Sequence, residues 1–171
     1  MTPDDYWRGN ARLEHLTPIG QRFPEVGLFD ALRQACRGSV FELGCGDGRL
    51  SAAFDPERYT GMDINPAALV RARQSNPGHR FTTEWQPADT VMAYTVLLHV
   101  PDDELPAMMR RLQAYPRIVI GEIMGRRWRT PGLPPVFNRE RAEYEAFLGP
   151  AREVIQVPYP YYGTDLELCA W

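Results

Sequence analysis

Lysine is absent from this chain and cysteine is scarce. All nineteen basic residues are arginine, against 22 acidic residues and a formal net charge of −3. Because non-specific nucleic-acid binding needs an excess of positive charge, we expect no nucleic-acid partner. The three cysteines, Cys36, Cys45 and Cys169, are odd in number and widely spaced. They form no CxxC or Cys/His cluster, so we expect neither a disulfide framework nor a metal site.

Long apolar runs are also missing. No stretch approaches the roughly 18 uninterrupted apolar residues of a membrane-spanning helix. Residues 1–15 are polar and mixed in charge, without the apolar segment of a signal peptide. We therefore expect a cytoplasmic protein with no membrane contact. No repeat or low-complexity tract divides the 171 residues, and 44% hydrophobic content is enough for the core of one domain.

Short apolar runs alternate with segments of helical periodicity, which is the pattern of a doubly wound α/β sheet. Only about four residues separate the last two expected strands, so these two should form an antiparallel hairpin. We predict a mostly parallel seven-stranded sheet with an antiparallel last strand and helices on both faces. The expected strands are Ser39 to Leu43, Tyr59 to Asp63, Arg80 to Glu84, Thr90 to Val96, Ile118 to Met124, Glu153 to Tyr159 and Thr164 to Trp171.

Helices are expected between these strands, and three polar residues are candidates for their N-caps. Asn65, followed by Pro66, is a good cap and first-turn pair, and Asp102 and Asn138 precede two later helical segments. The expected helices are Glu25 to Arg37, Arg49 to Phe54, Pro66 to about Ala72, Asp102 to about Ala114 and Arg139 to Leu148.

A glycine-rich turn follows the first strand. Gly44, Gly46 and Gly48 alternate there, and Asp63 stands nineteen residues after Gly44, at the end of the second strand. A carboxylate at that place can accept hydrogen bonds from both hydroxyls of a ribose, so the pair predicts a nucleoside-bearing ligand. A dinucleotide site would have glycine or alanine where this chain has Arg49, which disfavours a nicotinamide-dependent oxidoreductase.

At these residues the chain resembles the class I, Rossmann-like, S-adenosylmethionine-dependent methyltransferases. The segment from Glu42 to Gly48 follows the family's first motif, an acid followed by alternating glycines. Residues 61–65 resemble its second motif, and residues 92–105 resemble the fourth-strand segment of its small-molecule members. The resemblance covers residues 25–171 and implies S-adenosylmethionine as the cofactor. It implies that the methionine part of the cofactor is lined by Glu42, Gly44, Cys45 and Gly46.

The same resemblance implies that Asp63 holds the ribose and that Ile64 packs on the adenine. The family often has an acidic residue near the adenine amine after the third strand, followed by a longer loop than the one in this chain. Glu84 is a candidate for that acid, and Trp85 is a candidate for covering the ring. Residues 1–24 are expected to form a lid or an exposed arm. As a lid, this segment would bring Tyr6 as apolar cover and Arg12 as a partner for a carboxylate.

Methyl transfer from a sulfonium needs an aligned and desolvated nucleophile more than it needs a particular side chain. His99, just beyond the fourth strand, is the leading candidate for a general base, and Glu122, on the fifth, is a second acid or base. Each also has a structural alternative, because His99 can bond to loop backbone and Glu122 can pair with an arginine.

The loop after the fifth strand concentrates Arg126, Arg127 and Arg129 around Trp128, and guanidinium groups suit carboxylates or phosphates. The chain lacks the N/D-P-P-Y/F motif of amino-directed DNA methyltransferases. We therefore expect a methyltransferase that acts on oxygen or nitrogen of a small anionic or sugar-linked molecule, as a monomer or homodimer. The alternative is a non-catalytic partner or regulatory subunit that binds S-adenosylmethionine or S-adenosylhomocysteine.

Overall fold

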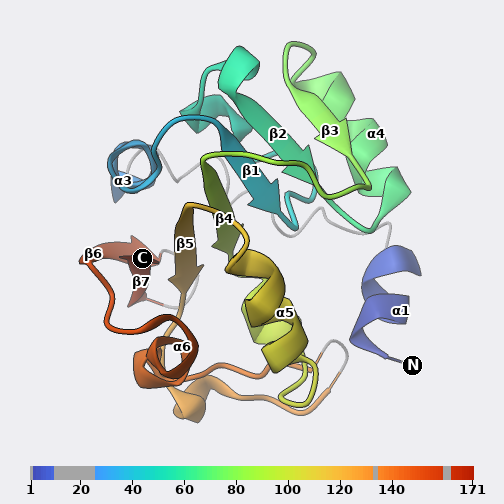
Figure 1. Ribbon diagram of the computed structural model, residues 1–171. Coiled ribbons are helices and arrows are strands. Elements are labelled where there is room, and N and C mark those ends of the chain that lie inside the picture. The colour runs from blue at the N-terminus through green and yellow to red at the C-terminus, as the bar shows by residue number, and fades with distance from the viewer. Residues whose placement is uncertain (1, 10–25, 133–134, 160–162) are drawn as a thin grey trace.

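The computed structural model describes residues 2–9, 26–132, 135–159 and 163–171 (Figure 1). One sheet has the strand order β3-β2-β1-β4-β5-β7-β6. Neighbours from β3 to β5 are parallel, whereas β7 runs antiparallel to both β5 and β6. This confirms the predicted sheet and its closing hairpin. The strands are β1 (Val40–Leu43), β2 (Tyr59–Met62), β3 (Arg80–Thr82), β4 (Thr90–Tyr94), β5 (Arg117–Glu122), β6 (Glu153–Tyr159) and β7 (Thr164–Ala170).

Helices cover both faces of the sheet, as predicted. Buried residues of α3 and α4 join one apolar cluster, and those of α5 and α6 join the other. The helices are α1 (Pro3–Gly9), α3 (Leu28–Ala35), α4 (Pro66–Ser75), α5 (Leu105–Leu112) and α6 (Arg141–Leu148). Among the described residues, no helix is long and apolar enough to cross a membrane.

The helix between β1 and β2 is shorter than predicted. In place of a helix over Arg49 to Phe54, there are two 3₁₀ turns, η3 (Ser51–Ala53) and η4 (Pro56–Arg58). Too few residues separate the glycine turn from Pro56 to repay the cost of nucleating an α-helix. The predicted start of α3, Glu25, lies outside the described residues.

One of the three predicted caps is confirmed and two are wrong. The Asn65 side-chain oxygen accepts hydrogen bonds from the backbone of Ala67 and Ala68 at the start of α4. Asp102 does not cap α5, which begins at Leu105, because two arginines bind its carboxylate instead. The Asn138 amide donates to the Ile123 carbonyl at 2.7 Å rather than capping α6. That helix is capped by a reciprocal pair formed by Glu140 and Glu143.

Candidate active site

The strand order reverses at β1 and β4, and in open α/β sheets ligands bind at the carboxyl ends of the strands beside such a reversal. A pocket of about 480 Å³ lies there, within the size range of small-molecule sites. Residues that follow β1, β2 and β4 form its wall, and α1 with the loops after β4 and β5 completes it. The strand ends contribute Leu43, Gly44, Gly46, Asp63, Ile64, Thr95 and Val96.

The glycine turn lines the pocket with backbone. Gly44 and Gly46 have φ angles of 69° and 56°, in the left-handed region that favours glycine. A Cβ atom added at Gly44 would lie 2.4 Å from Cγ2 of Val96, so a side chain would collide with the end of β4. The close approach of β4 to the turn therefore requires glycine, and a ligand can reach the backbone of both residues.

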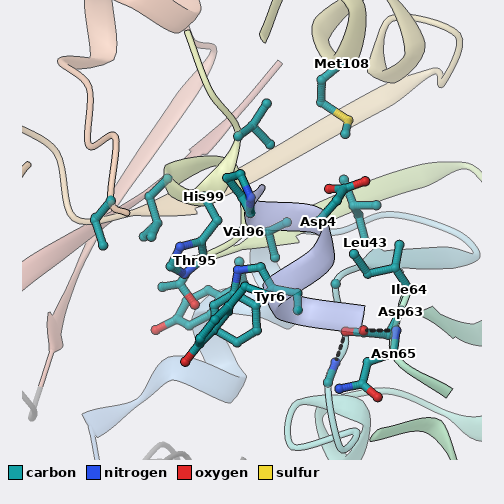
Figure 2. Close-up of a pocket in the computed structure, with 18 of the residues that line it drawn as sticks. Asp4, Tyr6, Leu43, Asp63, Ile64, Asn65, Thr95, Val96, His99 and Met108 are labelled. Carbon is teal, nitrogen blue, oxygen red and sulfur yellow. Dashed lines mark hydrogen bonds between the residues drawn. The ribbon is translucent and has the colours of Figure 1, made fainter. Parts of the chain in front are cut away.

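Asp63 ties the end of β2 to this turn (Figure 2). One carboxylate oxygen accepts a 2.8 Å bond from the Gly46 backbone, and the other accepts a 2.8 Å bond from the Asn65 backbone. Burial raises the pKa of the Asp63 carboxyl, and the bonds from Asn65 and Gly46 oppose that rise. Each oxygen has further lone pairs, so the carboxylate can also accept from the hydroxyls of a ribose.

Glu42 and Cys45, which the resemblance assigns to the cofactor, do not line the pocket. Glu42 is 2% exposed and accepts a short bond from the Tyr59 hydroxyl. Its burial raises its pKa to about 7, against the effect of that bond. The Cys45 thiol packs toward Gly61, where an added Cβ would meet it. The side chains of Glu42 and Cys45 therefore pack on the core side of the glycine turn and support it there.

Glu84 and Trp85 also lie away from the pocket. Glu84 is exposed. The Trp85 ring centroid lies 5.7 Å from that of Phe41, and the guanidinium carbon of Arg111 lies 4.0 Å from Trp85. The short connection after β3 directs this ring onto the face covered by α5. Ile64 lines the pocket as implied, and so do Asp4 and Met108, which Figure 2 labels.

The helix α1 crosses the pocket in Figure 2. Tyr6 and Trp7 are among its lining residues, and the Trp7 ring lies 4.7 Å from the His99 ring, between centroids. Arg12 lies outside the described residues, as does the segment that links α1 to α3.

His99 lines the pocket within the turn η5 (Leu97–His99). Its Nδ1 lies 3.4 Å from the Pro135 carbonyl oxygen. Burial lowers the pKa of His99 to about 4, while the carbonyl contact acts in the opposite direction. The imidazole is therefore neutral at pH 7. With Nδ1–H directed at the carbonyl, Nε2 is the atom able to accept a proton.

Glu122 is 1% exposed and does not line the pocket. Its Oε1 accepts a 3.2 Å bond from the Leu98 backbone, so it supports the turn that carries His99. Burial raises its pKa to about 8, and backbone N–H groups of the turn and the charge of Arg139 oppose the rise.

The arginines after β5 serve mainly as structural ties. Arg126 forms an ion pair with Glu143, and Arg129 forms a two-pronged pair with Asp102. Neither arginine lines the pocket, although Trp128 does. Arg49, which in the sequence marks only a departure from a dinucleotide motif, lines the pocket, and so does Thr95, for which the sequence predicts no role. Their positions, directly after the glycine turn and at the end of a central parallel strand, are the signals that could have found them.

Among the residues that the structure describes, no group of three His, Cys, Asp or Glu side chains could hold a metal ion.

Comparison with known proteins matches residues 41–115 to a family described as a methyltransferase domain. Trans-aconitate 2-methyltransferase of Escherichia coli is 29% identical over 136 residues, which are 72% of this chain and 52% of that protein. Ribosomal protein L11 methyltransferase of Nitrosomonas europaea is 33% identical over 109 residues, 50% of this chain and 34% of that protein. The chain thus spans about half, or less, of the length of these curated relatives.

Solved structures share the fold across nearly the whole chain. Magnesium protoporphyrin IX methyltransferase from Synechocystis, with bound S-adenosylmethionine, matches with a TM-score of 0.66 at 19% identity, covering 97% of this chain and 88% of that one. The 1,6-didemethyltoxoflavin-N1-methyltransferase of Burkholderia thailandensis matches with a TM-score of 0.66 at 19% identity, covering 98% of this chain and 85% of that one. That structure contains S-adenosylhomocysteine.

Residues 41–115 match a methyltransferase domain, and the fold is that of S-adenosylmethionine-dependent methyltransferases, whose cofactor is S-adenosylmethionine. The pocket fits this cofactor. Gly44 and Gly46 would expose backbone to it, the Asp63 carboxylate could accept from its ribose hydroxyls, and Leu43 and Ile64 would add apolar surface.

Proposed function

We propose that the protein methylates oxygen or nitrogen of a small, carboxylate-bearing molecule with S-adenosylmethionine as the methyl donor. One observation carries this proposal. The pocket that contains the glycine turn and Asp63 continues, without a separate site, to His99, Trp128 and Tyr159. Donor and acceptor would therefore share one partly closed space, which is what a direct transfer between two bound molecules requires.

When bound, S-adenosylmethionine supplies a methyl group activated by its sulfonium. The chain's own residues would bind and enclose the reactants. Gly44 and Gly46 would contact the methionine part through backbone, and Asp63 would accept from the ribose. Tyr6 and Trp7 of α1 would cover the pocket as a lid and reduce its access to water.

His99 is the proposed proton acceptor. Its Nδ1 faces the Pro135 carbonyl, which favours the tautomer with Nε2 open to a hydroxyl or amine of the acceptor. The lowered pKa keeps the ring neutral at pH 7 and therefore able to receive a hydrogen bond from the acceptor. Glu122 would contribute only by supporting the η5 turn.

A small acceptor is supported by the partly closed, largely apolar pocket and by the small-molecule relatives. The Escherichia coli relative is named for trans-aconitate, and the Burkholderia structure contains a small heterocycle, 1,6-didemethyltoxoflavin. The Nitrosomonas relative, named for a ribosomal protein, matches a smaller share of this chain.

A methyl-transfer assay tests the proposal. The purified protein is incubated with methyl-labelled S-adenosylmethionine and a panel of small carboxylic acids that includes trans-aconitate, and methylated products are identified by mass spectrometry. We expect His99→Ala to reduce turnover by about 10²-fold or more, as loss of a general base does, with little change in cofactor affinity. His79→Gln is the matched control, because His79 bonds to the Phe54 carbonyl and does not line the pocket.

Two results would count against parts of the proposal. Equal turnover in His99→Ala would make His99 a structural residue. Binding of S-adenosylmethionine without transfer to any panel member, or to proteins and nucleic acids of a cell extract, would favour the non-catalytic alternative.

A further inference from the structure

Arg49 is the one arginine among the described residues that line the pocket. It follows the last glycine of the turn and is half-buried. None of the three arginines in the loop after β5 lines the pocket: Arg126 is paired with Glu143, Arg129 with Asp102, and Arg127 lies over the Trp128 ring. The guanidinium charge at the pocket wall therefore comes from the glycine turn.

The end of β4 holds Arg49 in this place. Its Nη2 donates to Oγ1 of Thr95 at 3.0 Å, and its guanidinium carbon lies 5.8 Å from the centroid of the Tyr94 ring. A guanidinium carries five N–H donors, so the bond to Thr95 uses one of them and fixes the orientation of the group at the wall.

Thr95 has an unusual backbone. Among the described residues, it is the non-glycine residue with a positive φ, at 53°. Residues other than glycine adopt this conformation rarely, and such residues gather at functional sites. Thr95 both lines the pocket and accepts from Arg49, so the strained residue and the cation form one feature of the wall.

Arg49 connects two neighbouring parts of the pocket wall, the glycine turn that it follows and the end of β4 that it bonds. The β4 end that holds it also packs against the glycine turn, since Val96 fills the space beside Gly44. On the other side, Tyr94 packs beside Gly121 of β5, whose following loop would bind the acceptor in the proposed function. A ligand group bound by Arg49 would therefore lie near the junction of donor and acceptor.

We infer that Arg49 binds a carboxylate in this pocket and that Thr95 positions its guanidinium. The inference rests on the proposed function and deepens it by naming the ligand group. A carboxylate matches the guanidinium fork in shape and charge. Two partners of the proposed reaction carry one, namely the methionine part of the cofactor and an anionic acceptor.

Calorimetric titration of wild type, Arg49→Gln and Arg49→Lys separates these two sources. The first probe pair is S-adenosylhomocysteine, which carries the methionine-derived carboxylate, and 5′-methylthioadenosine, which lacks it. The second probe is trans-aconitate added to the protein saturated with S-adenosylhomocysteine. Arg80→Gln is the matched control, since Arg80 is exposed on β3 and does not line the pocket. Circular dichroism and melting curves check that each variant is folded.

If the cofactor supplies the carboxylate, Arg49→Gln weakens binding of S-adenosylhomocysteine by about tenfold or more, leaves 5′-methylthioadenosine unchanged, and Arg49→Lys recovers part of the loss. If the acceptor supplies it, S-adenosylhomocysteine binding is unchanged and trans-aconitate binding is lost in Arg49→Gln. Unchanged binding of every probe in a folded Arg49→Gln overturns the inference while leaving the proposed function intact. A wild-type protein that binds no S-adenosylhomocysteine overturns both.

Discussion

The buried carboxyl groups of Glu42 and Glu122 have a different role from the carboxylate of Asp63, which lines the pocket. The Asp63 carboxylate lies at the pocket wall and accepts hydrogen bonds from backbone N–H groups, and there it can also accept hydrogen bonds from a ligand. Glu42 and Glu122 are almost fully buried, and their pKa values rise to about 7 and about 8. Both are better placed to support backbone and neighbouring side chains than to exchange protons with a substrate.

The raised pKa of Glu122 predicts a pH dependence of stability. The pKa of its carboxyl is near the ordinary value of 4.5 when the chain is unfolded, and burial raises this pKa to about 8 when the chain is folded. The folded state therefore binds the proton more tightly, and this contribution to the free energy of unfolding is full below about pH 4.5 and is lost as pH rises toward 8. Glu122→Gln keeps an oxygen for the Leu98 N–H but does not titrate. We expect the wild type to lose on the order of 1 to 3 kcal/mol more than this variant between pH 5 and 8.

Denaturant unfolding at several pH values measures this difference. Glu57→Gln serves as the control, because Glu57 is exposed and does not line the pocket. Parallel stability curves for wild type and Glu122→Gln would contradict the raised pKa.

At the scale of elements, one carboxylate joins the segments that follow β4, follow β5 and precede α6. Asp102 follows β4 and binds Arg129 of the loop after β5 and Arg139, which precedes α6. Arg139 is 1% exposed and also donates to the carbonyls of Leu97 and Val100, on either side of His99. The position of the η5 turn thus depends on contacts between distant segments.

We expect Asp102→Asn to lower the free energy of unfolding by about 1 to 3 kcal/mol, because a buried guanidinium keeps its charge but loses its carboxylate. Asp102 is itself half exposed, which places the loss below that of a fully buried pair. Asp103→Asn, at the exposed neighbouring position, is the control for chemical denaturation. Equal stability of the two variants would remove Asp102 from this role.

The errors at helix ends have the same origin. Asp102 and Asn138 carry the side chains that usually cap helices, and both stand near a helical segment. Tertiary partners distant in the chain, Arg139 and the Ile123 carbonyl, take those side chains instead. The Asn65 side chain bonds the backbone of the helix that directly follows it, so its capping role could be predicted from the local sequence.

At the scale of the whole molecule, the fold could be predicted because strands buried by helices on two faces leave short apolar runs in the sequence. The pocket could be predicted only in part. Gly44, Gly46 and Asp63 lie in it because strand ends and turns fix their place. Cys45, Glu84 and Trp85 lie close in sequence to such positions, but their side chains do not face the pocket. Cys45 packs against Gly61, and Trp85 packs against Phe41 and Arg111. Glu84 is exposed to solvent.

In the proposed function, the two halves of the chain have different roles, one binding the cofactor and the other binding the acceptor. Strands β1 and β2 carry the turn and the acid for the cofactor, and the segments after β4 and β5 carry the acceptor side. The central claim is that this pocket binds S-adenosylmethionine, so the most direct measurement is calorimetric titration with S-adenosylmethionine, S-adenosylhomocysteine and NAD in parallel.

We expect micromolar binding of the first two ligands and none of NAD. Asp63→Ala should weaken that binding by about 1 to 3 kcal/mol, since it removes charge-assisted bonds to the ribose and the tie to Gly46. Asp30→Ala, with a side chain 83% exposed, should bind as wild type does. Binding of NAD alone, or equal affinity for S-adenosylmethionine in Asp63→Ala, would contradict the assignment of this pocket.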